Sequence, residues 1–268
     1  MIPIVKLAVV GKGGVGKTTV AGTIARLLSR DGFNVIALDA DPAMNLHSAI
    51  GISEENFAKI IPISEEKELI EERAGKGSVF IVNPKVDDIP TKYQIEGPDN
   101  VRLLVLGTVK KAKSGCMCPE NAFLRALLGH LILDVKDAVV IDMEAGIEHL
   151  GRGTLRYVDA MVIIIEPGRR STELAERIKE LAHELMVTRL YIIGNKVSTP
   201  DEEEFIKSMA KKLDIKLLGM IPYDNALRSA DLNGKAPIDF APDAPAIKEI
   251  ENIEKLLLTI INSDKNKE

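Results

Sequence analysis

The stretch Gly-Lys-Gly-Gly-Val-Gly-Lys-Thr-Thr at residues 11–19 decides the fold of this chain. It follows a run that is apolar except for Lys6, Ile4–Val10, and it leads into a helix-like segment, Lys17–Ser29. The stretch fits G-x-x-x-x-G-K-[ST] between a strand and a helix, which is the context that a phosphate-binding P-loop requires. Its glycines let successive N–H groups point at a phosphate, and the helix adds the positive end of its dipole.

The loop supplies two functional side chains besides its backbone. We expect Lys17 to reach the β- and γ-phosphates of a nucleotide and the Thr18 hydroxyl to ligate Mg²⁺. The pattern therefore predicts a Mg²⁺-dependent nucleotide-hydrolysing enzyme. The contacts to the nucleotide are expected from Gly13, Gly14, Val15, Gly16, Lys17, Thr18 and Thr19.

A dinucleotide-binding loop is the competing interpretation of the same glycines. Gly11, Gly13 and Gly16 also match G-x-G-x-x-G, and Asp39 ends the next predicted strand, where a ribose-binding acid would stand. A dinucleotide site has no use for a lysine and a hydroxyl directly after the third glycine. The pair Lys17-Thr18 therefore favours the P-loop.

Strand-like and helix-like runs alternate through most of the chain. This alternation predicts an α/β fold, a mostly parallel sheet with helices on both faces, in a single P-loop ATPase domain spanning residues 1–268. Residues 53–100 are charged and show short apolar runs, which predict a helical excursion and a β-hairpin. The further strands are expected at Asn34–Leu38, Val101–Leu106, Ala138–Ile141, Met161–Ile165, Leu190–Ile193 and Lys216–Met220, and the further helices at Glu120–Leu133, Thr172–Met186, Glu202–Leu213 and Ala244–Ile261.

Composition excludes several classes of protein. The 268 residues carry a formal net charge of -5, with a pI near 5.6. A mildly acidic chain without a large basic patch is a poor match to a nucleic-acid or anionic-membrane binder. No apolar run reaches the ~18–20 residues of a membrane helix, and the start lacks a signal peptide's pattern. We expect a cytoplasmic protein that binds neither nucleic acid nor membrane.

A second carboxylate is predicted at the nucleotide. Asp142 follows the buried run Ala138–Ile141, which is the Walker B arrangement, and its carboxylate should help to hold Mg²⁺.

The identity of the nucleotide's base is predicted from residues on a different strand. Asn195-Lys196-Val197-Ser198 lacks the acid of the guanine-binding pattern N-K-x-D, which favours ATP.

The two cysteines stand two residues apart, as Cys116-Met117-Cys118. This spacing strains a disulfide but lets both thiolates face one metal ion. Two thiolates half fill a tetrahedral site for Zn²⁺ or a similar soft metal, and a two-fold dimer would complete it with four sulfurs. Two buried cysteines without a metal remain the alternative.

The loop with its additional lysine, Lys12, resembles the deviant Walker A loop of the MinD/ParA/nitrogenase-iron-protein class. The resemblance implies a homodimer in which Lys12 reaches the partner's nucleotide, as an arginine finger does. It also implies that Asp41 helps to hold Mg²⁺ and orients the attacking water, and that the Gly146 amide meets the γ-phosphate. The segment Ile221-Pro222-Tyr223-Asp224 resembles the adenine side, which adds Pro222, Tyr223 and Asp224 to Asn195 as base-side residues.

Three features together resemble the CooC family, the accessory ATPases of carbon monoxide dehydrogenase. They are the phosphate loop, the C-x-C-P-E of residues 116–120, and the run Asp-Met-Glu-Ala-Gly-Ile-Glu-His-Leu-Gly-Arg-Gly at 142–153. The resemblance implies insertion of nickel into carbon monoxide dehydrogenase or acetyl-CoA synthase. It also implies that Cys116 and Cys118 bind Ni²⁺ or Zn²⁺ across the dimer. Residues 53–100 carry none of it, and Glu144 stands where members of the wider class often have proline.

Two other functions stay open at this point. A MinD/ParA-type positioning ATPase would need a basic amphipathic C-terminal helix for membrane attachment, whereas Lys248–Ile261 places acidic residues among its apolar ones. An iron–sulfur reductase component like the nitrogenase iron protein would also share a metal centre between subunits. Its two cysteines lie far apart in sequence, unlike those at 116 and 118.

Overall fold

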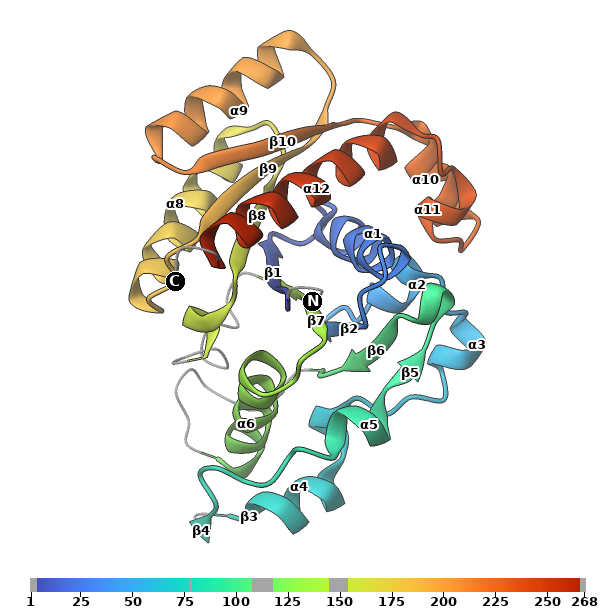
Figure 1. The fold of residues 1–268 in the computed structure, drawn as a ribbon, viewed down its shortest axis with the longest axis vertical. Helices are drawn as coiled ribbons and strands as arrows, with labels where there is room; N and C mark the ends of the chain where they lie inside the picture. Colours follow the sequence, from blue (N-terminus) through green and yellow to red (C-terminus); the bar gives the residue numbers. More distant parts are fainter. Residues whose placement is uncertain (1–3, 78, 108–117, 145–153, 266–268) are drawn as a thin grey trace.

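The computed structural model describes residues 4–77, 79–107, 118–144 and 154–265, apart from the side chain at 264 (Figure 1). Its strands are β1 (Lys6–Gly11), β2 (Val35–Ala40), β3 (Gly75–Lys76), β4 (Val79–Phe80), β5 (Ile95–Glu96), β6 (Arg102–Val105), β7 (Ala138–Glu144), β8 (Ala160–Ile165), β9 (Leu190–Val197) and β10 (Lys216–Pro222). Eight of them form one sheet in the order β10-β9-β8-β1-β7-β2-β6-β5. In the described part of the chain, all pairings in this sheet are parallel except that of β5 with β6.

Helices cover both faces of the sheet (Figure 1). One face packs against α4, α5, α6, α8 and α9, and the other against α1, α2, α10, α11 and α12. The bounds are α1 (Lys17–Arg30), α2 (Leu46–Ile50), α3 (Glu54–Phe57), α4 (Lys67–Ala74), α5 (Ile89–Tyr93), α6 (Pro119–Leu133), α8 (Arg169–Glu184), α9 (Pro200–Lys212), α10 (Asn225–Leu232), α11 (Pro237–Phe240) and α12 (Pro245–Lys265), with short 3₁₀ turns η1 (Ile63–Glu65), η2 (Pro98–Asn100) and η3 (Leu155–Tyr157).

The apolar run of β1 shows why the central strands are buried on both faces. Leu7 and Val9 belong to the core beneath α1, whereas Ala8 and Val10 belong to the core on the opposite face. Successive side chains of a strand point to opposite faces, so a strand covered on both sides needs apolar residues at every position. The predicted α/β sheet with helices on both faces is therefore confirmed.

The sequence-predicted elements are all present, with shifted ends. The strand expected at Ala138–Ile141 continues to Glu144, and the one expected at Leu190–Ile193 continues to Val197. Both extensions carry polar residues of the site, which an apolar run cannot reveal. The described helices include none that is long and apolar enough to cross a membrane.

Residues 53–100 hold the expected helices and hairpin. Strands β3 and β4 pair antiparallel, flanked by α4 and α5. Strand β5 was not anticipated: it pairs antiparallel with β6 and forms one edge of the main sheet. Strand β5 is only two residues long, too short to show a periodicity.

Candidate nucleotide-binding site

The functional residues converge because the central strands are parallel. Val9 of β1 lies beside Asp142 of β7, and Asp142 lies beside Asp39 of β2. The phosphate loop and the two acidic segments therefore leave the same, carboxyl edge of the sheet, where ligands of such sheets bind.

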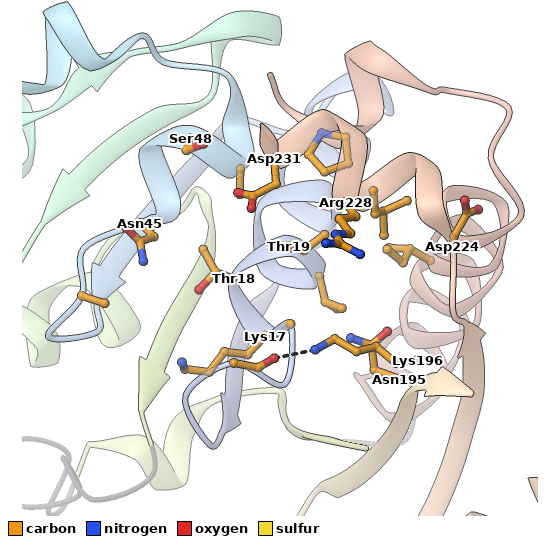
Figure 2. A pocket seen from close by; sticks show the side chains of 18 of the residues that line it. Lys17, Thr18, Thr19, Asn45, Ser48, Asn195, Lys196, Asp224, Arg228 and Asp231 are labelled. Atoms are coloured by element: carbon orange, nitrogen blue, oxygen red, sulfur yellow. Dashed lines mark hydrogen bonds between the residues drawn. The ribbon is translucent and has the colours of Figure 1, made fainter. Parts of the chain in front are cut away.

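A cavity of about 700 Å³ opens at this edge over the start of α1. Figure 2 shows Asn45 and Ser48 on one side of the loop and helix, and Asn195, Lys196 and Asp224 on the other. Its lining comprises Gly13, Gly14, Gly16, Lys17, Thr18, Thr19, Val20, Asp41, Ala43, Asn45, Ser48, Ala49, Glu54, Asn195, Lys196, Pro222, Tyr223, Asp224, Leu227, Arg228, Asp231, Gly234, Lys235, Pro237 and Ile250.

The phosphate loop is curled as its glycines allow. Gly14 and Gly16 have φ angles of 84° and 91°, in the left-handed region that side chains with a Cβ disfavour. A Cβ at Gly16 would also collide with the Asn195 amide. Lys12 is exposed, whereas Val15 is buried beneath the loop. The loop thus presents Lys12 to the outside.

Lys17 forms a buried ion pair with Asp41. Its Nζ lies 2.5 Å from the Asp41 Oδ2, and both side chains are under one-tenth exposed. Asp41 also accepts the N–H of Ala43 at 2.8 Å, which fixes the carboxylate at the start of the segment leading to α2. The two residues predicted to act on the phosphates and on the attacking water are therefore in contact.

Thr18 and Asp142 form the second pair. The Thr18 hydroxyl donates to the Asp142 Oδ2 at 2.6 Å. Burial raises the pKa of Asp142 from its ordinary value of 3.8 to about 6, although the Thr18 hydrogen bond and the Lys17 charge lower it. The Asp142 Oδ1 is buried and has no hydrogen-bond partner in the described parts of the chain.

Asp39 anchors the segment that carries Asp41. Its carboxylate accepts the N–H groups of Leu46 at 2.9 Å and of Asp41 at 3.1 Å. Burial, together with the neighbouring Asp142 and Asp41 charges, raises the pKa of Asp39 to about 7, although the hydrogen bonds from Leu46 and Asp41 lower it. Because the carboxylate is engaged by this backbone, it holds the start of α2 and does not serve as a ribose-binding acid.

Mg²⁺ fits these groups. The ion prefers oxygen ligands and is usually held by one or two carboxylates together with substrate phosphates and water. Thr18 and Asp142 supply a hydroxyl and a buried carboxylate with an unpartnered oxygen, beside the phosphate loop. Among the described residues, no group of three or more His, Cys, Asp or Glu side chains is arranged to hold a metal.

Two of the residues predicted to bind the base, Asn195 and Asp224, lie across the phosphate loop and α1 from Asn45 and Ser48 (Figure 2). Asn195 is buried and donates its Nδ2 to the carbonyl of Val15 at 2.7 Å. Asp224 accepts the N–H groups of Ala226 at 2.9 Å and Ala246 at 3.3 Å, so its carboxylate caps α10. Because that carboxylate is bound to the protein's own backbone, Asp224 has a structural role as well as a place in the lining.

Sequence reasoning missed part of the lining. Asn45 and Ser48 come from α2 and the turn before it, and Glu54 begins α3, where no motif marks them. Arg228 and Asp231 come from α10. These two stand three residues apart and therefore share one helix face, a signal that could have identified them once α10 was recognised.

Two residues of the sequence prediction, Cys116 and Gly146, lie outside the described residues. Cys118 is described: it is half-buried and stands at the N-cap of α6. The predicted cysteine metal site is therefore not tested by this structure.

The fold and site define a P-loop nucleotide-binding protein, and comparison with known families agrees. The CobQ/CobB/MinD/ParA nucleotide binding domain matches residues 7–238, and the chain belongs to that family. Among solved structures, the MinC:MinD cell division complex of Aquifex aeolicus has a TM-score of 0.70 at 18% identity, covering 95% of this chain and 96% of that one. MinD with Mg-ADP from Pyrococcus horikoshii has a TM-score of 0.65 at 18% identity, covering 94% and 96%.

Two relatives within this family have a much higher sequence identity to the chain than the solved structures do. The chain is 47% identical over 241 residues to the carbon monoxide dehydrogenase accessory protein CooC of Rhodospirillum rubrum, covering 88% of this chain and 90% of that protein. It is 43% identical over 265 residues to an uncharacterized ATP-binding protein of Methanocaldococcus jannaschii, covering 96% and 99%. The predicted resemblance to CooC and to MinD/ParA proteins is confirmed, and the relatives indicate an ATPase.

Proposed function

We propose that this protein is a nucleotide-gated, dimeric metallochaperone that helps to insert nickel into carbon monoxide dehydrogenase or a related nickel enzyme. The observation that carries the proposal is the 47% identity to CooC, a carbon monoxide dehydrogenase accessory protein, over 88% of this chain. The pair Cys116 and Cys118 supports it, because two thiolates suit a soft metal ion.

The ATPase site performs the first part of this function. Lys17 would contact the β- and γ-phosphates. Thr18 and Asp142 would hold Mg²⁺, which would compensate the phosphate charge, and Asp41 would orient the attacking water. The loop from Gly13 to Thr19 binds the phosphates, and the base is held by Asn195, Pro222, Tyr223 and Asp224.

Dimer formation performs the second part. Lys12 is exposed on the loop of a single chain, and we assign it to the partner's phosphates, where a cation stabilises the transferring phosphoryl group. The Gly146 amide meets the γ-phosphate in the same closed state. Hydrolysis removes those contacts and lets the acidic segments relax.

The described elements on either side of the cysteines support a coupling between the cysteine pair and the nucleotide site. Strand β6 ends at Val105, beside Asp39 of β2, and α6 begins at Pro119, directly after Cys118. Closure of a two-fold dimer brings two pairs of thiolates to one Ni²⁺ ion, with Zn²⁺ as the alternative occupant. At equilibrium the coupling is reciprocal: if ATP strengthens metal binding, the metal strengthens ATP binding by the same factor.

A MinD/ParA-type positioning ATPase is the second candidate, supported by the fold similarity to MinD. Helix α12 argues against attachment through the C-terminal helix, because Ile250, Ile253, Leu257 and Ile261 are buried in the core. We therefore propose a cytoplasmic protein without a membrane or nucleic-acid partner. Pelleting with liposomes or DNA in the presence of ATP tests this. An iron–sulfur reductase role would be supported only by visible absorption of anaerobically purified protein.

Light scattering and elemental analysis, carried out on the same samples, test the proposal. The samples are wild type and Cys116→Ala/Cys118→Ala, each with no nucleotide, with ADP and with a non-hydrolysable ATP analogue. We expect one nickel or zinc per dimer, an affinity that changes with nucleotide, and loss of the metal in the double variant. An ATP-dependent dimer whose metal content ignores both cysteines would refute the nickel role and leave an ATPase of the positioning class.

A further inference from the structure

Two consecutive side chains at the end of β9 hold the phosphate loop from its outer side. Asn195 donates to the Val15 carbonyl at 2.7 Å, and the next residue, Lys196, donates its Nζ to the Gly14 carbonyl at 2.7 Å. Both side chains line the nucleotide cavity (Figure 2). The loop is therefore tied to a strand that is distant in sequence and lies two strands away from β1 in the sheet.

The backbone of Lys196 adopts a conformation that suits this contact and is otherwise unfavourable. Its φ angle is 59°, in the left-handed region that costs a residue with a Cβ roughly 1–2 kcal/mol. In regular strand conformation, side chains alternate between the two faces of a sheet. The left-handed turn breaks this alternation, so that Asn195 and Lys196 both reach the loop. Residues held in such conformations concentrate at functional sites.

A third residue holds the lysine. Glu166, which directly follows β8, forms a short ion pair with the Lys196 ammonium. Lysine has three N–H donors and no acceptor, so one ammonium can serve Gly14 and Glu166 together. The loop that follows β1 is thus held at Gly14 by Lys196 of β9. Lys196 in turn is held by Glu166, which directly follows β8.

The geometry of phosphate binding explains the use of such a link. A loop that turns its N–H groups inward toward an anion turns carbonyl groups outward, and these need donors of their own. We propose that the Glu166–Lys196 pair positions the phosphate loop, including Lys12 within it. The pair thereby sets the loop's affinity for nucleotide phosphates. Both are positioning residues, because neither contact requires touching the reacting atoms. The inference rests on the ATP-binding part of the proposed function and not on nickel transfer.

Five variants test the pair: Lys196→Met, Lys196→Arg, Glu166→Gln, the double variant Lys196→Met/Glu166→Gln, and a control. The control is Lys207→Met, which breaks a half-exposed ion pair with Glu203 on α9, away from the cavity. For each protein, calorimetric titration gives the Kd for ADP and for a non-hydrolysable ATP analogue with Mg²⁺. The thermal midpoint is measured with and without nucleotide, because a purely structural role would lower the midpoint of the protein alone.

We expect Lys196→Met to weaken both nucleotides about tenfold, since hydrogen bonds from charged donors are worth about 1.5–3 kcal/mol and this one is partly exposed. The midpoint without nucleotide stays within about 2 °C of wild type, as for an exposed substitution. Lys196→Arg restores most of the affinity. Glu166→Gln alone weakens nucleotide binding less than Lys196→Met does. Adding Glu166→Gln to Lys196→Met weakens binding no further, because Glu166 acts only through Lys196. Lys207→Met matches wild type.

Three results would overturn the inference. They are an unchanged Kd in Lys196→Met, a loss no larger than in Lys207→Met, and effects of Glu166→Gln and Lys196→Met that simply add. Failure of the proposed ATPase function has a different signature, since wild type itself would then bind neither nucleotide.

Discussion

Replacement of Asp142 by asparagine should stabilise the protein while abolishing its use of Mg²⁺. The carboxylate is fully buried, and its pKa lies at about 6 instead of 3.8. A pKa shift of one unit corresponds to 1.36 kcal/mol, so ionised Asp142 costs the folded state about 3 kcal/mol relative to a neutral group. This cost already includes the stronger hydrogen bond from Thr18 to the charged carboxylate. Asparagine is neutral and can still accept the Thr18 hydroxyl, so the expected gain is about 3 kcal/mol.

The pH dependence identifies the cause of that gain. Because the folded-state pKa is raised, the folded protein binds a proton that the unfolded chain releases between pH 3.8 and about 6. The wild type therefore loses this stability as pH rises through that window, and the full cost is present above it. At pH 8 the gain in Asp142→Asn should be about 3 kcal/mol, and at pH 5 about half of it should remain.

Urea denaturation with EDTA at pH 5 and pH 8 measures both values. In the same assay without EDTA, Mg²⁺ with a non-hydrolysable ATP analogue should stabilise wild type strongly and Asp142→Asn only weakly. The variant lacks the anionic metal ligand. A variant that is less stable than wild type at pH 8 in EDTA would refute the reasoning, as would a gain of equal size at both pH values.

The remaining predictions concern dimerisation, loop geometry and core stability. Lys12→Ala should bind ATP as a monomer but lose ATP-dependent dimerisation and about 10³-fold in hydrolysis, measured by light scattering and phosphate release; unchanged turnover would contradict the role across the dimer. Gly16→Ala should lose nucleotide binding by calorimetry, because its Cβ meets Asn195 at a φ of 91°; binding with wild-type affinity would refute this. Arg26→Met removes a buried guanidinium from its pair with the partly exposed Asp239 at 2.7 Å and should cost about 1.5–3 kcal/mol in urea denaturation; a cost below about 1 kcal/mol would show that the network is dispensable.

The sequence predicts most of the fold because the sheet is buried on both faces. Apolar runs such as Ile4–Val10 mark strands directly, and the phosphate loop fixes the order of strand and helix around it. The ends of β7 and β9 were less predictable, since Asp142 and Asn195 are polar residues in strand conformation. Residues 53–100 allowed only a coarse prediction, because their elements are short and their positions depend on tertiary packing.

The site was predictable where a motif has a fixed spacing and unpredictable elsewhere. Lys17, Thr18, Asp41 and Asp142 meet as expected, because parallel strands deliver their carboxyl ends to one edge. The anchoring role of Asp39 depends on hydrogen bonds to the backbone seven residues away, which no side-chain pattern records.

The contact between Lys17 and Asp41 has a consequence for the choice of ligand. A bare anion, such as free phosphate, gains an ammonium partner only by competing with a carboxylate already bonded to it. A nucleotide that arrives with its own divalent cation avoids this competition, because the cation compensates the displaced carboxylate. We therefore expect the Lys17–Asp41 ion pair to favour binding of the metal–nucleotide complex over free phosphate.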